Sequence, residues 1–145
     1  MCDTRTNILT RGLVAPLLLL QRIQHLPAIE ITVQGQKVTA LIDSGNLVPR
    51  IVIAAQLAPK LITTIYPSVI VQARTACNSY EFKEAKMLGI ISVGTYIFPS
   101  PIVTWSPDYQ LNNLGSFFLQ NFAVTFDQKN NRVRLSNKFT PSVVP

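Results

Sequence analysis

The sequence has few of the residues that enzymes commonly use for nucleophilic and metal chemistry. Its 145 residues include one histidine and two cysteines. Because His25 is alone, the sequence gives little basis for histidine-based catalysis or a multi-histidine metal site. Cys2 and Cys77 lie far apart, and neither has a second ligand at metal spacing. We therefore expect no metal, no cofactor and two free thiols, which favours a reducing compartment such as the cytoplasm.

A long apolar run is also missing. The segment from Gly12 to Leu20 is well short of the ~20 apolar residues that span a bilayer. The residues that follow, 21–25, contain no small-residue cleavage site of the kind that a signal peptide requires. We expect no stable membrane span, and we interpret residues 13–20 as a strand or a poor anchor.

Acids are scarce, so the formal net charge is +6. A nucleic-acid-binding surface gathers basic residues on one face. Here the lysines and arginines are scattered along the chain, with no basic run and no interleaved aromatic residues. The charge pattern therefore indicates no nucleic-acid partner. A nucleic-acid-binding β-barrel remains an alternative that the net charge motivates.

The composition is that of a single globular domain. Hydrophobic residues make up 48% of the chain and charged residues 14%, and a chain of this length supports one core rather than two. We expect a frayed N-terminus over residues 1–12, one domain over residues 13–139 and a tail over residues 140–145.

Apolar and polar residues alternate over residues 28–34, which is the period of a half-buried strand. A turn at residues 34–36 and an apolar return strand at residues 38–42 complete a predicted hairpin. We expect a short C-terminal helix at residues 116–121, with Phe117 and Phe118 toward the core, and a short helix within residues 54–61. Further strands are expected at residues 47–53, 69–74, 80–87, 101–105, 122–127 and 132–135. Residues 87–98 are expected to form a strand, a turn at Gly94 and another strand. Many short strands with turn signals predict an all-β domain, a closed or partly closed β-barrel.

The most informative segment is Ala-Leu-Ile-Asp-Ser-Gly at residues 40–45. An apolar strand rarely ends in an acid, because burying an unpaired carboxylate is costly. A tight turn at Gly45 would leave Asp43 facing a cavity rather than bulk water. Among the aspartates of the chain, Asp43 alone is followed by a hydroxyl residue and a glycine.

This hexapeptide resembles the active-site turn of the pepsin/retropepsin-like aspartic proteases, which reads apolar-apolar-Asp-Thr/Ser-Gly. The hairpin at residues 29–40 is similar to the one that leads into that turn. The segment Asn113-Leu114-Gly115, with the helix and hairpin after it, is similar to the second signature of the family. The resemblance covers residues 28–136, in the order of a single-lobed, retropepsin-type member.

The resemblance implies an aspartic endopeptidase that acts on a peptide or protein substrate. Two carboxylates share one proton in this family, and they activate a water molecule without a covalent intermediate. Because the chain has one motif, the second carboxylate would come from the Asp43 of a second copy in a homodimer. Ser44 and Gly45 would complete the active-site turn, and Leu114 and Gly115 would pass beneath it as a supporting turn.

The family also implies a flap hairpin over the active site, which would have its tip at Ala76, Cys77, Asn78 and Ser79. This tip has no glycine, whereas family flaps tend to carry one. Asn113 stands where the family usually has an apolar residue, and Asn46 replaces the more usual Ala or Ser. These departures motivate an alternative, a catalytically inactive β-barrel of the same fold that serves as a binding or dimerisation module.

Overall fold

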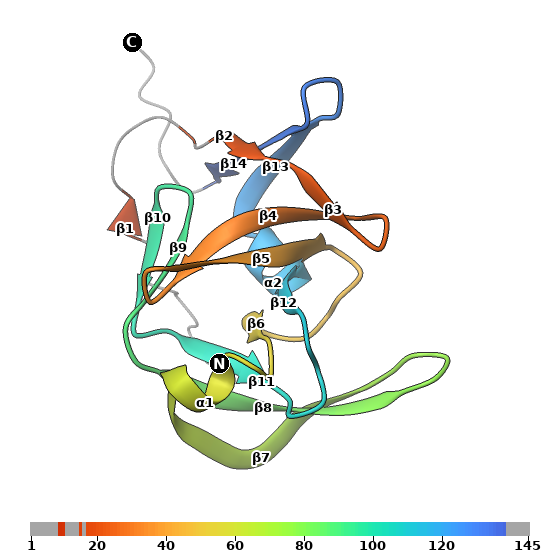
Figure 1. Cartoon of the computed structure of the whole chain (residues 1–145), viewed down its shortest axis with the longest axis vertical. Helices are drawn as coiled ribbons and strands as arrows, with labels where there is room; N and C mark the ends of the chain where they lie inside the picture. Colours follow the sequence, from red (N-terminus) through yellow and green to blue (C-terminus); the bar gives the residue numbers. More distant parts are fainter. Residues whose placement is uncertain (1–8, 11–14, 16, 139–145) are drawn as a thin grey trace.

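The computed structural model describes residues 9–10, 15 and 17–138, and most of these lie in short strands (Figure 1). Two four-residue helices accompany them, α1 (Ala58–Leu61) and α2 (Ser116–Leu119). The strands are β1 (Leu9–Thr10), β2 (Leu17–Leu19), β3 (Gln21–Ile23), β4 (Leu26–Val33), β5 (Gln36–Asp43), β6 (Ile51–Ile53), β7 (Ile62–Arg74), β8 (Ser79–Met87), β9 (Ile90–Val93), β10 (Tyr96–Pro99), β11 (Ile102–Trp105), β12 (Asn112–Gly115), β13 (Phe122–Asp127) and β14 (Arg132–Asn137).

The strands form two sheets. The larger one has 11 strands in the order β1-β10-β9-β4-β5-β12-β6-β11-β8-β7, with β3 paired to β4, and the smaller one has the order β13-β14-β2. Figure 1 shows the smaller sheet at the top and the β7–β8 hairpin at the bottom. The end strands β1 and β7 do not pair with each other in the described residues. The all-β prediction is confirmed, whereas barrel closure stays a prediction.

The hairpin of β4 and β5 has the predicted alternation. Ile29, Ile31 and Val33 are buried, and Glu30 between them is exposed. The turn places Gly35 at φ +78°, a backbone conformation that glycine adopts without steric cost. Burial becomes continuous from Ala40 to Ile42 as β5 enters the interior. Side chains alternate across a strand, so Ile42 enters the large core while Asp43 faces the opposite side of β5.

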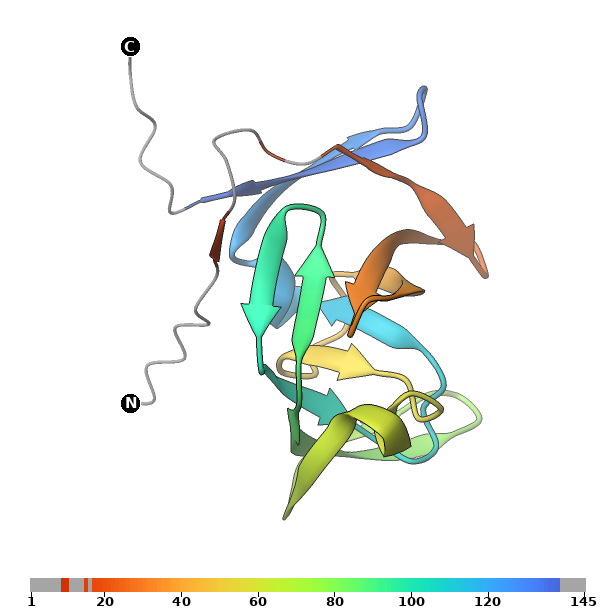
Figure 2. The same ribbon diagram turned by 60° about the vertical axis from the view of Figure 1, so that its left-hand side comes forward.

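The core has two parts. The larger one includes Ile42 of β5, Leu114 of β12 and Phe118 of α2, and it extends to β14. The smaller one consists of Val48, Val52 and Phe82, with Tyr80 and Tyr109 packed against it. Figure 2 shows the β9–β10 hairpin standing beside the other strands of the large sheet.

For the middle of the chain, the structure corrects three expectations that were drawn from the sequence. The expected strand at residues 47–53 is limited to β6, because Arg50 has a φ of +71° and interrupts the extended backbone. The first strand of the next hairpin begins at Ile62 rather than at residue 69. The short helix expected within residues 54–61 covers only α1, which tolerates Pro59 because proline is in its first turn.

Helix α2 corrects one further expectation. Phe118 is buried at 6% exposure, as predicted, but Phe117 is 46% exposed. Adjacent residues on a helix point about 100° apart, so a single turn cannot direct both rings into the core.

The chain ends are described only in part. Leu9 and Thr10 form β1, which pairs with β10, although we expected residues 1–12 to be frayed. The other residues of that segment, with Cys2 among them, and residues 139–145 lie outside the described structure, so the division into terminus, domain and tail stays a prediction. No helix among the described residues is long and apolar enough to cross a membrane.

Candidate active site

The motif at residues 40–45 forms the end of β5 and a tight turn. The Gly45 N–H donates to Asp43 Oδ1 over 3.1 Å, and the Asn46 N–H donates to the Asp43 carbonyl over 3.1 Å. Ser44 and Gly45 are exposed, and Asp43 is half-buried. The turn therefore fixes the orientation of one carboxylate oxygen and leaves the carboxylate in contact with solvent.

The predicted supporting residues lie directly beside this turn. Strand β12 runs parallel to β5, with Leu114 opposite Ile42 and Gly115 opposite Asp43. The Ser116 N–H donates to the Asn46 carbonyl over 2.9 Å. The structure thus brings Asp43 and Gly115 together across 72 residues of sequence (115 − 43).

The close approach of β12 to the loop after Asp43 requires a glycine at position 115. A Cβ added to Gly115 would lie 2.7 Å from the Asn46 carbonyl oxygen, which is closer than real Cβ atoms come. The backbone of Gly115 is in an ordinary extended conformation, so the constraint is the contact and not the dihedral angles.

Asn46 has a structural role within the turn. Its Oδ1 accepts the Val48 N–H over 2.9 Å, which is a local side-chain bond typical of asparagine in turns. The side-chain oxygen of Asn46 is thus used within the loop that leaves the Asp43 turn.

The predicted flap corresponds to the β7–β8 hairpin, which projects to the right in Figure 1. Its tip, Ala76, Cys77, Asn78 and Ser79, is exposed, and Cys77 is a free thiol. The Thr75 N–H donates to the Asn78 carbonyl over 2.8 Å and closes the tip without glycine.

The half of this hairpin next to the tip packs near the Asp43 turn through aromatic rings. Tyr80 and Phe82 of β8 make edge contacts with Tyr109, with ring centroids 5.4 and 5.3 Å away. Val48, two residues beyond the turn, joins the same cluster. The structure therefore attaches the hairpin beside the Asp43 turn, and the tip extends beyond this contact.

Sequence reasoning did not identify Tyr109 as part of the site. It lies in the connection between β11 and β12, and its hydroxyl accepts the Nδ2 hydrogen of Asn113 over 3.4 Å. Burial raises the pKa of the Tyr109 phenol above its usual value of 10.0, the Asn113 bond opposes this, and the charges of Asp43 and Tyr80 add to the rise. Nothing in the sequence pattern distinguishes Tyr109 from the other aromatic residues of the chain.

We expect the Tyr109 phenol to lose its proton at a higher pH than an ordinary tyrosine does. Its neutral form is favoured in the fold, so its stabilising contribution is present below the unfolded pKa near 10 and is lost as the pH rises through the higher folded pKa. An ultraviolet titration of tyrosinate should show a component that titrates above pH ~10, and Tyr109→Phe should remove it. If the variant retains that component, the assignment is wrong.

Asn113 is fully buried, and its Nδ2 has a hydrogen-bond partner whereas its Oδ1 does not. It is 0% exposed, and its Oδ1 has no hydrogen-bond partner within the described part of the chain. The adjacent Asn112 is different, because its Oδ1 accepts the Ala54 N–H over 2.9 Å and its Nδ2 donates to the Thr39 carbonyl over 3.1 Å. A buried polar atom without a partner costs about 1–3 kcal/mol.

We therefore expect Asn113→Leu to raise the free energy of unfolding by about 1 kcal/mol, because it removes the buried Oδ1 that has no partner while keeping a branched shape. Asn112→Leu is the matched control. It leaves a backbone donor and a backbone acceptor without partners, and should lower stability by about 2 kcal/mol or more. Urea unfolding of both variants measures the difference, and a loss of stability in Asn113→Leu would contradict the argument.

A cavity in the described structure lies apart from the Asp43 turn, none of whose residues lines it. Its volume is about 500 Å³, and its walls come from the segment around Arg50, the β10–β11 connection and α2. The expected placement of Asp43 at a cavity stays a prediction. In the described ranges, no three His, Cys, Asp or Glu side chains gather to form a metal site.

The comparisons with known proteins agree with this geometry at the level of the fold. Neither a protein-family model nor a curated protein matches the sequence. Among solved structures, a retropepsin-like aspartic protease from Rickettsia conorii is similar, with a TM-score of 0.52 and 17% sequence identity over 94% of this chain and 98% of that chain. The fold of this chain is therefore similar to that of a retropepsin-like aspartic protease.

Proposed function

We propose that this protein is an aspartic endopeptidase that works as a homodimer with two Asp43 residues at one active site. The proposal depends mainly on the pairing of Asp43 with Gly115 across β5 and β12. The hydrogen bond from the Ser116 N–H to the Asn46 carbonyl stabilises this pairing. The similarity of the fold to a retropepsin-like aspartic protease supports it. The proposal includes a single domain over residues 13–139 and a large sheet that curls into a partly closed barrel.

The chemistry requires two carboxylates that share one proton. The ionised Asp43 removes a proton from a water molecule as the water oxygen attacks the scissile carbonyl carbon. The protonated Asp43 of the second copy donates its proton to the carbonyl oxygen. Collapse of the tetrahedral intermediate breaks the C–N bond, and the first Asp43 gives the proton it took from water to the leaving nitrogen. One hydroxyl of the intermediate returns its proton to the Asp43 of the second copy as the C=O bond re-forms. Both carboxylates then return to their starting state.

The neighbouring residues have supporting roles in this proposal. The Gly45 N–H orients one oxygen of Asp43, and the exposed Ser44 hydroxyl is available for a hydrogen bond across the dimer. The β7–β8 hairpin would cover an extended peptide, which would bind by strand addition between the hairpin and the floor of the site. No cofactor takes part.

The direct test is peptide hydrolysis by the whole chain. A peptide library is incubated with the protein at acidic to neutral pH, with and without a statine-type inhibitor, and the products are identified by mass spectrometry. We expect internal cleavage that the inhibitor abolishes. Specific activity should also rise with protein concentration, together with the dimer fraction measured by sedimentation, because one chain supplies one carboxylate.

The alternative function is a binding or dimerisation module with the same fold and no hydrolysis. The buried Asn113 and the glycine-free hairpin tip favour it, since both depart from the protease pattern. A dimer that cleaves no peptide in the library would support this alternative. A strictly monomeric chain without cleavage would exclude the dimeric protease.

A further inference from the structure

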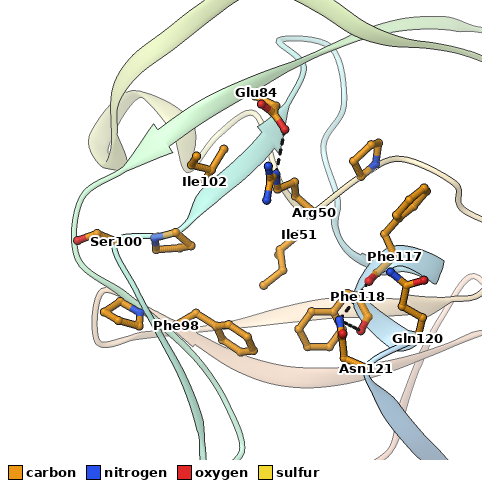
Figure 3. Close-up of a pocket in the computed structure, with 13 residues that line it drawn as sticks. Arg50, Ile51, Glu84, Phe98, Ser100, Ile102, Phe117, Phe118, Gln120 and Asn121 are labelled. Atoms are coloured by element: carbon orange, nitrogen blue, oxygen red, sulfur yellow. Dashed lines mark hydrogen bonds and ion pairs between the residues drawn. The ribbon is translucent and has the colours of Figure 1, made fainter. Parts of the chain in front are cut away.

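The cavity beside α2 is a concave site apart from the Asp43 turn. Its volume of about 500 Å³ is in the range of pockets that hold small molecules. Figure 3 shows Phe98 and Phe118 on its lower side, Ile102 on its left and Phe117 on its right. Phe117 is 46% exposed and Ile102 is 38% exposed, so the cavity presents apolar side chains to solvent.

The floor of this cavity is aromatic. The rings of Phe98 and Phe118 are tilted by 55°, with centroids 5.6 Å apart, and Phe117 lies at the opening. Three prolines add apolar surface to the walls, at positions 49, 99 and 101. Aromatic rings prefer tilted or offset contacts with other rings. A ligand with a flat ring would therefore find matching surfaces on the floor and at the opening.

Arg50 and Glu84 supply the polar part of the cavity. Their hydrogen bond joins Arg50 Nε to Glu84 Oε1 over 2.9 Å, and the two side chains are only 26% and 27% exposed. Among the described residues, neither the Nη groups of Arg50 nor Glu84 Oε2 has a hydrogen-bond partner. Figure 3 shows the guanidinium group between Glu84 and Ile51. The pair therefore has no net charge, and it still offers donors and an acceptor side by side.

The backbone of two walls is held in an unusual conformation. Arg50 and Ser100, which lie in separate walls, have φ values of +71° and +43°. Such values are unfavourable for residues with a Cβ, and they concentrate at functional sites where the surrounding fold maintains them. The shape of the cavity is therefore fixed by the fold.

We propose that this cavity binds an uncharged aromatic molecule that carries an amide group. The ring lies against Phe98 and Phe118, and Phe117 covers its outer side. The amide oxygen accepts a hydrogen bond from an Nη group of Arg50, and the amide nitrogen donates to Glu84 Oε2. A charged head group is disfavoured, because the Arg50–Glu84 pair has no net charge to compensate it when it leaves water. This binding site is independent of the proposed hydrolysis at Asp43.

The test titrates the full chain with hydrocinnamamide, which has a phenyl ring and a primary amide. Isoleucine methyl groups are labelled for NMR, because Ile51 and Ile102 line the cavity while Ile29 does not. We expect the signals of Ile51 and Ile102 to shift with a Kd on the order of 1 mM, as a ligand of this size allows, and that of Ile29 to stay. Hydrocinnamate, a carboxylate of the same shape, should bind about fivefold more weakly.

Two variants locate the probe within the cavity. Phe117→Ser removes the outer ring contact, and Arg50→Lys keeps the positive charge beside Glu84 but loses the planar set of donors. Each should weaken hydrocinnamamide about fivefold. Phe126→Ser is the matched control and should leave the Kd unchanged, because Phe126 is 43% exposed and does not line the cavity.

The outcomes separate the site from the class of ligand. Unchanged Ile51 and Ile102 signals at millimolar hydrocinnamamide, or full affinity in both Phe117→Ser and Arg50→Lys, would overturn the site. Hydrocinnamate binding as tightly as the amide would overturn the uncharged class. None of these readouts depends on peptide hydrolysis, so they stand or fall apart from the proposed function.

Discussion

Replacing Asp43 by asparagine is expected to abolish peptide hydrolysis, with kcat reduced at least ~100-fold. The amide cannot accept the proton of the attacking water, and in a homodimer both copies lose this function. The side-chain oxygen of asparagine can still accept the Gly45 N–H, so the turn should keep its shape. Steady-state cleavage of the best library peptide measures the loss, and sedimentation and thermal unfolding verify the fold.

Asp127→Asn is the matched control for this variant. Asp127 is an exposed acid at the end of β13, and hydrogen bonds from Asn130 lower the pKa of its carboxyl group. The substitution removes the same charge away from the Asp43 turn, so activity should be retained. Hydrolysis by Asp43→Asn at the parent rate would mean that the chemistry lies elsewhere, or that a contaminant supplies it.

Gly115→Ala is expected to reduce both stability and activity. The new Cβ would lie 2.7 Å from the Asn46 carbonyl oxygen, so the backbone of one of the two segments must move. Overpacking of this kind costs about 1–3 kcal/mol. The same movement lengthens the bond between Ser116 and Asn46 and displaces the Asp43 turn, and a displacement of about 1 Å can reduce the rate ~100-fold.

Gly35→Ala is the control that separates the loss of stability from the loss of activity. Gly35 has a φ of +78°, so alanine should cost about 1–2 kcal/mol, but its added Cβ meets no atom within 4 Å. This variant should lose stability and keep its kcat. If Gly115→Ala keeps full activity at a temperature where it is folded, the contact with Asn46 does not position the carboxylate.

The local hairpins were predictable from the sequence because their signals are local. The alternation of Ile29, Ile31 and Val33 with polar residues, and the turn at Gly35, define β4 and β5 without reference to the rest of the chain. The end of β5 at Asp43 was expected for the same reason, since the apolar run stops there.

Strand β12 was not predictable in this way. Asn112 and Asn113 are poor strand formers. They become strand residues because β5 pairs with both of them and β6 pairs with Asn113 on the other side. Arg50 shows the reverse effect, since a run rich in β-forming residues is interrupted there by a positive φ. In both cases tertiary contacts decide the conformation, and a single sequence carries no signal of them.

The roles of individual side chains were the least predictable. Phe117 and Phe118 are identical residues at adjacent positions, yet one is buried and the other borders a cavity. Tyr109 reaches the vicinity of Asp43 because the β11–β12 connection folds back toward the Asp43 turn. Such placements follow from the path of the backbone, which composition and spacing do not specify.

The parallel pairing of β5 with β12 also has a consequence for biosynthesis. The ribosome completes the Asp43 turn long before it adds Gly115, so a nascent chain carries the acidic motif without the strand that supports it. Long-range contacts of this kind form late and slowly. A nascent chain that ends before Gly115 therefore lacks the organised carboxylate, and any hydrolytic capacity arises only after β12 has left the ribosome and paired with β5.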